Sequence, residues 1–471
     1  MKHWSRNLRA VVCLFACLLL CGCSSVRFLT PMETLQAPRS DGHYEGVRDA
    51  LETAVGSNIV MKYPKGDDGV ASYMTADLDG DGADEVLAFY RQNTEGATTR
   101  IHLLRQNKDG KWISVQDISS SGVELDTVQF ADLDNDGIPE VVTGWSLYDS
   151  RNSTMALYKM SDGQLNQRAE ELYTDYVLFD INADQVTEIV LLMLSADKTA
   201  YCSALNFSET DGVTLAGRVQ MDGNVGSYLS ILTSTADPEH PALFIDATKG
   251  TDATLTEVIY WNDGLINAFF DPATGETAQT YRPFFAVCRE EVMQEQPQLP
   301  INSNPLQEST QELNQDEQKE TEAKIESEQQ THILIPFAKA APLRVNENTA
   351  KWYLDWRTFA LGETQSVGVF YENEAYHYRF CLPTQWVDKV TYTVSDDSST
   401  VTFFAVDSQA SGEELLRLRI FGKTQVEDAQ SIGYELLTSD NTYIYTARLR
   451  KDTALAVPLT QISELFSLKG R

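Results

Sequence analysis

The sequence predicts a mainly β protein, with a domain of repeated β units followed by a smaller α+β domain. Two observations carry this prediction. An acidic motif starts at residues 77, 132 and 180, each time followed by an apolar run, and this spacing suits a unit of four short strands. Residues 288–336 contain no Phe, Trp or Tyr and separate the repeats from a tail of different composition. We therefore expect two folded domains with a linker between them.

The N-terminus predicts export. Lys2, Arg6 and Arg9 precede an apolar run over residues 10–21. Crossing ~30 Å of hydrocarbon as a helix needs about 20 apolar residues, so the run is too short for a permanent span. A charged segment followed by a short apolar one is typical of a removable signal peptide. We expect the mature chain to leave the cytoplasm.

The residues Leu20-Cys21-Gly22-Cys23 resemble the lipobox of bacterial lipoprotein precursors. The resemblance implies cleavage after Gly22 and lipidation of Cys23 with acyl chains such as palmitate. Two or more acyl chains hold a protein firmly on a membrane. The expected location is the outer face of the cell membrane. An ordinary signal peptide with a chance cysteine is the alternative.

The charge and the cysteines limit the partners. Loss of Lys2, Arg6 and Arg9 with the signal would change the net charge from −32 to −35. Such acidity argues against nucleic acid as a partner and suits a protein that holds divalent cations. Apart from Cys23, the mature chain keeps Cys202, Cys288 and Cys381, which form no CxxC pair. Buried free thiols are expected, and one disulfide is the alternative.

The predicted domain order follows from composition. A polar tether leads to residues 47–55, which have helical spacing and stop at Gly56. Residues 307–330 are mostly Glu, Gln, Ser, Thr and Asn and cannot bury enough apolar surface to fold. Residues 454–468 have helical spacing, with Pro458 near the first turn. The expected segments are a signal peptide at 1–22, a tether at 23–42, a helix with repeats at 43–288, a linker at 289–335 and an α+β domain at 336–471.

The acidic motifs predict calcium sites. Ca²⁺ takes roughly six to eight oxygen ligands, which a tight loop supplies when carboxylates alternate and a glycine lets the chain turn. Asp and Gly also form metal-free turns, which is the alternative. In the third copy Gln185 replaces the glycine and loses its ease of positive φ. The predicted ligands are Asp77, Asp79, Asp81, the Ala83 carbonyl and Glu85; Asp132, Asp134, Asp136, the Ile138 carbonyl and Glu140; and Asp180, Asn182, Asp184 and Glu188.

These motifs are not EF-hands, because position twelve is Ala88 or Thr143 instead of glutamate and the flanks are β-rich. They resemble the FG-GAP or VCBS-type repeats of integrin-like β-propellers over about residues 60–285. The resemblance implies a partial or irregular propeller in which structural Ca²⁺ stiffens the blades and does no chemistry. A fourth, eroded copy is expected from Leu243-Phe-Ile-Asp246 to Glu257-Val-Ile-Tyr260, and a fifth at residues 284–292. Together with the lipobox, the arrangement resembles the VCBS-repeat lipoproteins of Gram-positive anaerobes.

The sequence offers no catalytic motif, since HExxH, GxSxG and the P-loop pattern are all absent. We expect a binding or scaffold module for an extracellular protein or glycan, and no enzyme. A carbohydrate-active hydrolase or lyase is an alternative that needs two carboxylates converging in a pocket. An accessory subunit of a membrane complex is another, and it needs an exposed apolar patch on residues 345–471. Aromatic residues of the tail, expected to be core rather than a ligand platform, are Trp352, Trp356, Tyr371, Tyr376, Tyr378 and Trp386.

Overall fold

The computed structural model describes residues 45–65, 71–120, 122–147, 152–234, 240–294, 329–344, 347–360, 362–406, 412–450 and 453–469. The predicted signal peptide, Cys23 and the tether lie outside these residues. Within the described ranges, no helix has the length and apolar character needed to cross a membrane. The described residues form six antiparallel sheets, so the predicted mainly β fold is confirmed.

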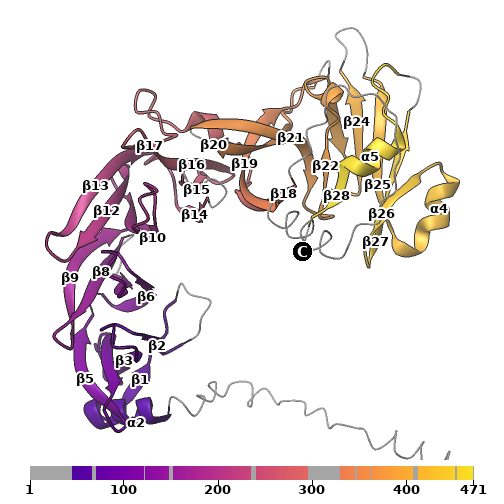
Figure 1. The fold of residues 1–471 in the computed structure, drawn as a ribbon. Helices are drawn as coiled ribbons and strands as arrows, with labels where there is room; N and C mark the ends of the chain where they lie inside the picture. The colour runs from indigo at the N-terminus through magenta and orange to yellow at the C-terminus, as the bar shows by residue number, and fades with distance from the viewer. Residues whose placement is uncertain are drawn as a thin grey trace, which may run out of the picture.

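The repeat domain consists of four blades (Figure 1). In blade one the short strands β1 and β2 both pair with β3, and together they fill the place of a single inner strand. The strands of blade one are β1 (Ile59–Met61), β2 (Tyr73–Ala76), β3 (Glu85–Gln92), β4 (Arg100–Gln106) and β5 (Trp112–Ser119). Blade two has β6 (Glu124–Ala131), β7 (Glu140–Ser146), β8 (Ser153–Ser161) and β9 (Gln164–Tyr173). Blade three has β10 (Asp175–Phe179), β11 (Glu188–Leu194), β12 (Ala200–Ser208) and β13 (Gly212–Met221), and blade four has β14 (Tyr228–Thr233), β15 (Ala242–Lys249), β16 (Ala253–Asn262) and β17 (Leu265–Ala268).

The blades stack face to face along an open arc (Figure 1). The second strand of each blade is buried on both faces, and such strands need unbroken apolar runs instead of alternation. Leu78, Leu133 and Ile181, each the second residue of an acidic motif, are buried in the cores between blades one and two, two and three, and three and four. The motifs therefore tie each blade to the next.

Both ends of the arc are covered. Helix α2 (Glu45–Val55) packs Val47 and Leu51 against blade one, and Gly56 ends it at φ 88°, as the sequence predicts. At the other end Phe244 of blade four packs against Ile335 and Phe337 of β19. An open stack of sheets needs such covers, because a bare terminal blade would expose its apolar face.

The C-terminal domain packs a six-stranded sheet against a five-stranded one. The first sheet has β18 (Arg289–Gln294), β19 (Gln329–Ala340), β20 (Trp352–Ala360), β21 (Glu363–Asn373), β22 (Tyr378–Cys381) and β28 (Phe466–Leu468). The second has β23 (Val390–Val394), β24 (Thr400–Ala405), β25 (Glu414–Gly422), β27 (Tyr443–Leu449) and β26 (Glu435–Ser439), with the helices α4 (Val426–Ser431) and α5 (Leu459–Leu465) beside the sheets.

Two predicted boundaries need correction. Strand β18 and the first part of β19 fall within the expected 289–335 linker, yet the two strands pair with each other and join the C-terminal sheet. The helix expected over 454–468 is shorter, because Pro458 stands at its N-cap and the chain becomes strand β28 from Phe466. Proline lacks the N–H that a helix interior needs, so the helix begins after it.

The expected fourth and fifth motif copies are wrong. Asp246 lies inside β15 and Glu257 inside β16, whereas the genuine motifs join the first and second strands of a blade. The expected fifth copy runs into β18 of the C-terminal sheet. In both places an acidic residue between apolar neighbours imitated the motif.

The tail aromatics and the cysteines behave as expected. Trp356, Tyr371, Tyr378 and Trp386 are buried, and the last three of these belong to the core between the two C-terminal sheets. Their interpretation as core residues is therefore confirmed. The three described cysteines, Cys202, Cys288 and Cys381, are free thiols, and the first two are buried.

Candidate metal centre in the blade loops

The three motif loops share one backbone conformation. Loop one is residues 77–85, loop two is residues 132–140 and loop three is residues 180–188. The first aspartate of each loop accepts, through Oδ2, the N–H of the residue five positions later: Gly82, Gly137 and Gln185, at 2.8–2.9 Å. All three of these residues have positive φ, and Gln185 reaches 70° despite its side chain. The loop fold therefore survives the loss of glycine, at the steric cost that a left-handed side chain brings.

The last carboxylate of each loop is buried and anchored in the same way. Oε2 of Glu85, Glu140 and Glu188 accepts the N–H of the second loop residue at 3.0, 2.8 and 3.0 Å. The exposed fractions of these glutamates are 3%, 0% and 0%. In each case the other oxygen, Oε1, is directed toward the remaining acidic side chains, and its partner distinguishes the three loops.

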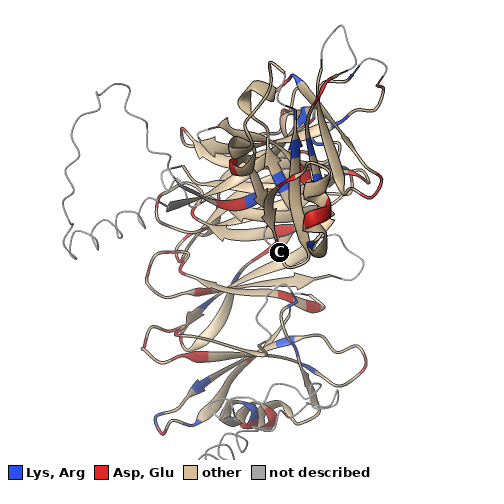
Figure 2. Cartoon of the chain, turned by 90° about the vertical axis from the view of Figure 1, so that its right-hand side faces the viewer, with Lys and Arg blue, Asp and Glu red and all other residues tan. Residues whose placement is uncertain are grey.

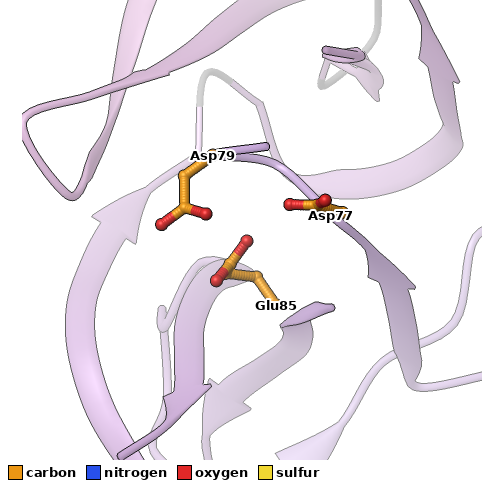
Figure 3. Close-up of side chains that lie close together, drawn as sticks. All are labelled: Asp77, Asp79 and Glu85. Atoms are coloured by element: carbon orange, nitrogen blue, oxygen red, sulfur yellow. The ribbon is translucent and has the colours of Figure 1, made fainter. Parts of the chain in front are cut away.

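In loop one the carboxylates face each other (Figure 3). One oxygen each from Asp77, Asp79 and Glu85 lies within 4.8 Å of the others. Asp81 is not in this group and accepts the N–H of Ala83 at 2.8 Å. Among the described residues, no donor reaches Oε1 of Glu85. Burial, with a smaller contribution from the aspartates, raises the pKa of Glu85 to about 7.

In loop two a lysine ammonium occupies the position between the carboxylates. Nζ of Lys159, on β8, donates to Asp134 Oδ2 at 2.9 Å, Asp136 Oδ2 at 2.8 Å and Glu140 Oε1 at 2.5 Å. Burial opposes the charge, but these hydrogen bonds outweigh it and raise the pKa of Lys159 above its usual range. The sequence analysis missed this residue, which lies 25 positions from Asp134.

In loop three a neutral amide takes the same role. Nδ2 of Asn182 donates to Glu188 Oε1 at 2.8 Å and to Asp184 Oδ2 at 3.0 Å. An amide satisfies two acceptors but adds no positive charge. Burial raises the pKa of Glu188 to about 7.

The three loops therefore differ in their fitness for Ca²⁺. Loop one offers three hard oxygen ligands, one each from Asp77, Asp79 and Glu85, which fits a divalent cation. In loop two, oxygens of Asp132, Asp134 and Asp136 also lie within 4.8 Å of one another, but the last two already bind the Lys159 ammonium together with Glu140. Loop three has lost one carboxylate to an amide, whose Nδ2 is turned toward the other acidic side chains.

A separate cavity of about 510 Å³ opens on the outer strands between blades two and three. Its walls come from β9, β11, β12 and β13. Leu172, Tyr201 and Leu215 line it and are exposed by 50%, 36% and 55%. Arg218 lies over the ring of Tyr201 at 6.0 Å. The combination of exposed apolar side chains and a few polar groups is typical of a binding site.

Comparison with known protein families supports the repeat pattern that the loops show. Residues 64–143, which include loops one and two, match the model of the FG-GAP-like repeat family. Together with the stacked sheets, this match defines a mainly β protein with FG-GAP-like repeats in a propeller-like arrangement. No curated protein matches the chain.

Among solved structures, an exotype rhamnogalacturonan lyase has 10% identity and a TM-score of 0.26, with 75% of this chain and 73% of that chain covered. A protein from Lactobacillus plantarum has 10% identity and a TM-score of 0.24, with 75% and 94% covered. A mannose phosphorylase from Leishmania mexicana has 6% identity and a TM-score of 0.19, with 47% and 75% covered. These low TM-scores do not establish a shared fold or activity.

Proposed function

We propose that this chain is a lipoprotein anchored through Cys23 on the outer face of a bacterial membrane, where its blades bind another protein. In this proposal loop one holds a structural Ca²⁺ that stiffens blade one. The observation that carries the binding role is the cavity between blades two and three, with Leu172, Tyr201 and Leu215 exposed along it. Its lining combines aliphatic side chains with charged and hydroxyl groups and holds one aromatic ring, that of Tyr201. This mixture suits a peptide segment better than a glycan, which stacks on flat aromatic rings.

Binding fits the chemistry better than catalysis does. Three glutamates, Glu85, Glu188 and Glu257, have their pKa raised to about 7, as a general acid would. Each is buried and accepts backbone N–H groups, and none of them lines the cavity between blades two and three. A hydrolase or lyase needs two carboxylates that converge where a substrate can enter.

The charge also favours a protein partner over nucleic acid. Figure 2 shows Asp and Glu spread over the blades, whereas several Lys and Arg gather on the C-terminal domain. With a net charge of −32, the chain would repel phosphate backbones.

Site-specific photocrosslinking on intact cells tests the binding role. A photoreactive amino acid at Leu215, inside the cavity, is expected to yield a discrete crosslinked protein. The matched control is Leu265 on β17, which is 68% exposed and outside the cavity. Identical products at both positions, or none at Leu215, would contradict a partner at this cavity. In the same cells, Cys23→Ala is expected to move the protein from the membrane fraction to the medium.

Calcium titration tests the metal. Wild-type protein is expected to bind Ca²⁺ and to gain about 2.7 kcal/mol of stability at a hundredfold excess over Kd. Asp79→Asn removes one negative charge from the loop-one ligands and should abolish both effects. Asp109→Asn, at an exposed aspartate in another turn of blade one, is the control and should leave them unchanged. A wild-type melting temperature that does not change when Ca²⁺ is added would contradict a structural Ca²⁺ ion in loop one.

A further inference from the structure

We infer that loop two carries its own cation, the ammonium of Lys159, and that this lysine excludes divalent metal, so that only blade one responds to calcium. The inference deepens the proposed calcium role and rests on it for the ion in loop one only. Because loops one and two share the same acidic sequence pattern, the sequence predicts a Ca²⁺ ion in each of them. This inference predicts an ion in loop one only.

The lysine contacts are those of a coordinated cation. Its three N–H groups meet oxygens of three different carboxylates, from Asp134, Asp136 and Glu140, at 2.5–2.9 Å. The side chains of Lys159, Asp134 and Glu140 are exposed by only 5%, 7% and 0%. A buried charge is tolerated when it is paired and fully hydrogen-bonded, and both conditions are met here.

The next blade holds the lysine in place. The ring of Phe207, on β12 of blade three, lies 6.0 Å from Nζ of Lys159. Phe207 belongs to the core between blades two and three, together with Leu133 of loop two. The ammonium is thus enclosed on one side by carboxylates and on another by a packed interface. Its departure would disturb that interface as well as the loop.

A metal ion and this ammonium cannot share the loop. Ca²⁺ binds carboxylate oxygens at about 2.3–2.6 Å, and these oxygens already lie within 3.1 Å of Nζ. A bound ion would face a positive charge a few ångströms away in a poorly solvated site, where repulsion is strong. Because the lysine is part of the chain, it also needs no free cation from solution.

Strand register shows how the difference arises. Lys159 stands directly opposite Glu140 across β7 and β8, next to the Val141–Tyr158 pair. The corresponding residue in blade one is Arg105, next to the Val86–Leu104 pair, and it is exposed and forms no ion pair among the described residues. In blade three the corresponding residue is Asn206. One position on the third strand thus decides whether a loop keeps an internal cation.

Counting bound ions in the full chain tests the inference. Equilibrium dialysis with radioactive calcium is expected to give one ion per wild-type chain and two per Lys159→Met chain. Asp134→Asn should leave the wild-type number at one, but should return Lys159→Met from two to one. Asp79→Asn should remove the loop-one ion from every background. Circular dichroism of each variant confirms that the protein is folded.

The outcomes separate this inference from the calcium role of loop one. Two ions on wild type, or loss of an ion on Asp134→Asn alone, would overturn it. A folded Lys159→Met chain that binds no additional ion would also overturn it. No ion on wild type but one on Lys159→Met would refute calcium in loop one and support the lysine. If Lys159→Met fails to fold, the comparison of wild type with Asp134→Asn and Asp79→Asn still decides which loop holds the ion.

Discussion

Single side chains decide what each loop of this protein can bind. Glu85, Glu140 and Glu188 occupy equivalent positions with equivalent backbone anchors. Oε1 of Glu140 meets an ammonium and Oε1 of Glu188 an amide, whereas Glu85 lies beside two aspartates. The same loop backbone therefore accommodates three different arrangements of charge beside the buried glutamate. Backbone hydrogen bonds set the loop conformation, and the central contact sets its charge.

Glu257 is a buried carboxylate outside the loops, and it predicts a pH effect. Burial raises its pKa from 4.5 to about 7, against hydrogen bonds from Thr277 Oγ1 at 2.9 Å and Phe270 N at 2.8 Å. The folded state thus retains a proton that the unfolded chain has lost. Stability should fall as pH rises from about 4.5 to about 7, by at most about 1.4 kcal/mol per pH unit for this group.

Urea unfolding across this pH range, with Ca²⁺ removed, measures the effect. Glu257→Gln cannot ionise and should reduce the pH slope relative to wild type. Glu276→Gln, at an exposed glutamate, is the control and should retain the wild-type slope. Equal slopes in all three proteins would mean that Glu257 has the same protonation state in the folded and the unfolded chain over this pH range.

At the scale of elements, local patterns could be predicted from the sequence and pairing across strands could not. The loop ligands follow from residues a few positions apart, and so do the short helix before Gly56 and the buried β3, β7 and β11 runs. Lys159 reaches loop two only because β8 lies beside β7 in one register, which no local pattern reveals. The fourth motif copy was wrongly predicted at Asp246 and Glu257 for the same reason, since the positions of these residues within strands depend on pairing.

Arg282 joins two elements and predicts a large loss on removal. It is fully buried, pairs with Asp246 of β15 at 3.4 Å, and donates through Nη1 to the Pro336 carbonyl of β19 at 2.9 Å. Arg282→Met would leave Asp246 buried without its cation, at a cost of about 3–5 kcal/mol. Denaturant unfolding measures this cost.

The matched control for Arg282 is Arg450→Met, at an arginine that is 52% exposed and pairs with Glu413 at 3.9 Å. An exposed pair contributes about 1 kcal/mol or less. A loss for Arg282→Met no larger than that of the control would show that blade four and the C-terminal sheet are held together by apolar packing alone.

For the whole molecule, the covers at the two ends explain why an open arc is stable. Each blade packs on its sequence neighbours, and the terminal faces meet α2 and the six-stranded sheet (Figure 1). Stability in such a stack is approximately a sum of unit and interface contributions. The sequence predicted the repeats and the C-terminal domain, but it could not predict that a sheet of that domain would continue the stack.

This arrangement predicts that damage at the α2 end stays local. Leu51 is fully buried between α2 and blade one, so Leu51→Ala should cost about 2–5 kcal/mol through the cavity it creates. Hydrogen exchange should accelerate most in β3 and β4, less in β7, and not at all in β24. Thr53→Ala, on the exposed face of α2, should leave exchange unchanged in all of these strands. Equal acceleration in β3 and β24 would mean that the blades and the C-terminal domain unfold as one unit, and the α2 end could then not loosen alone.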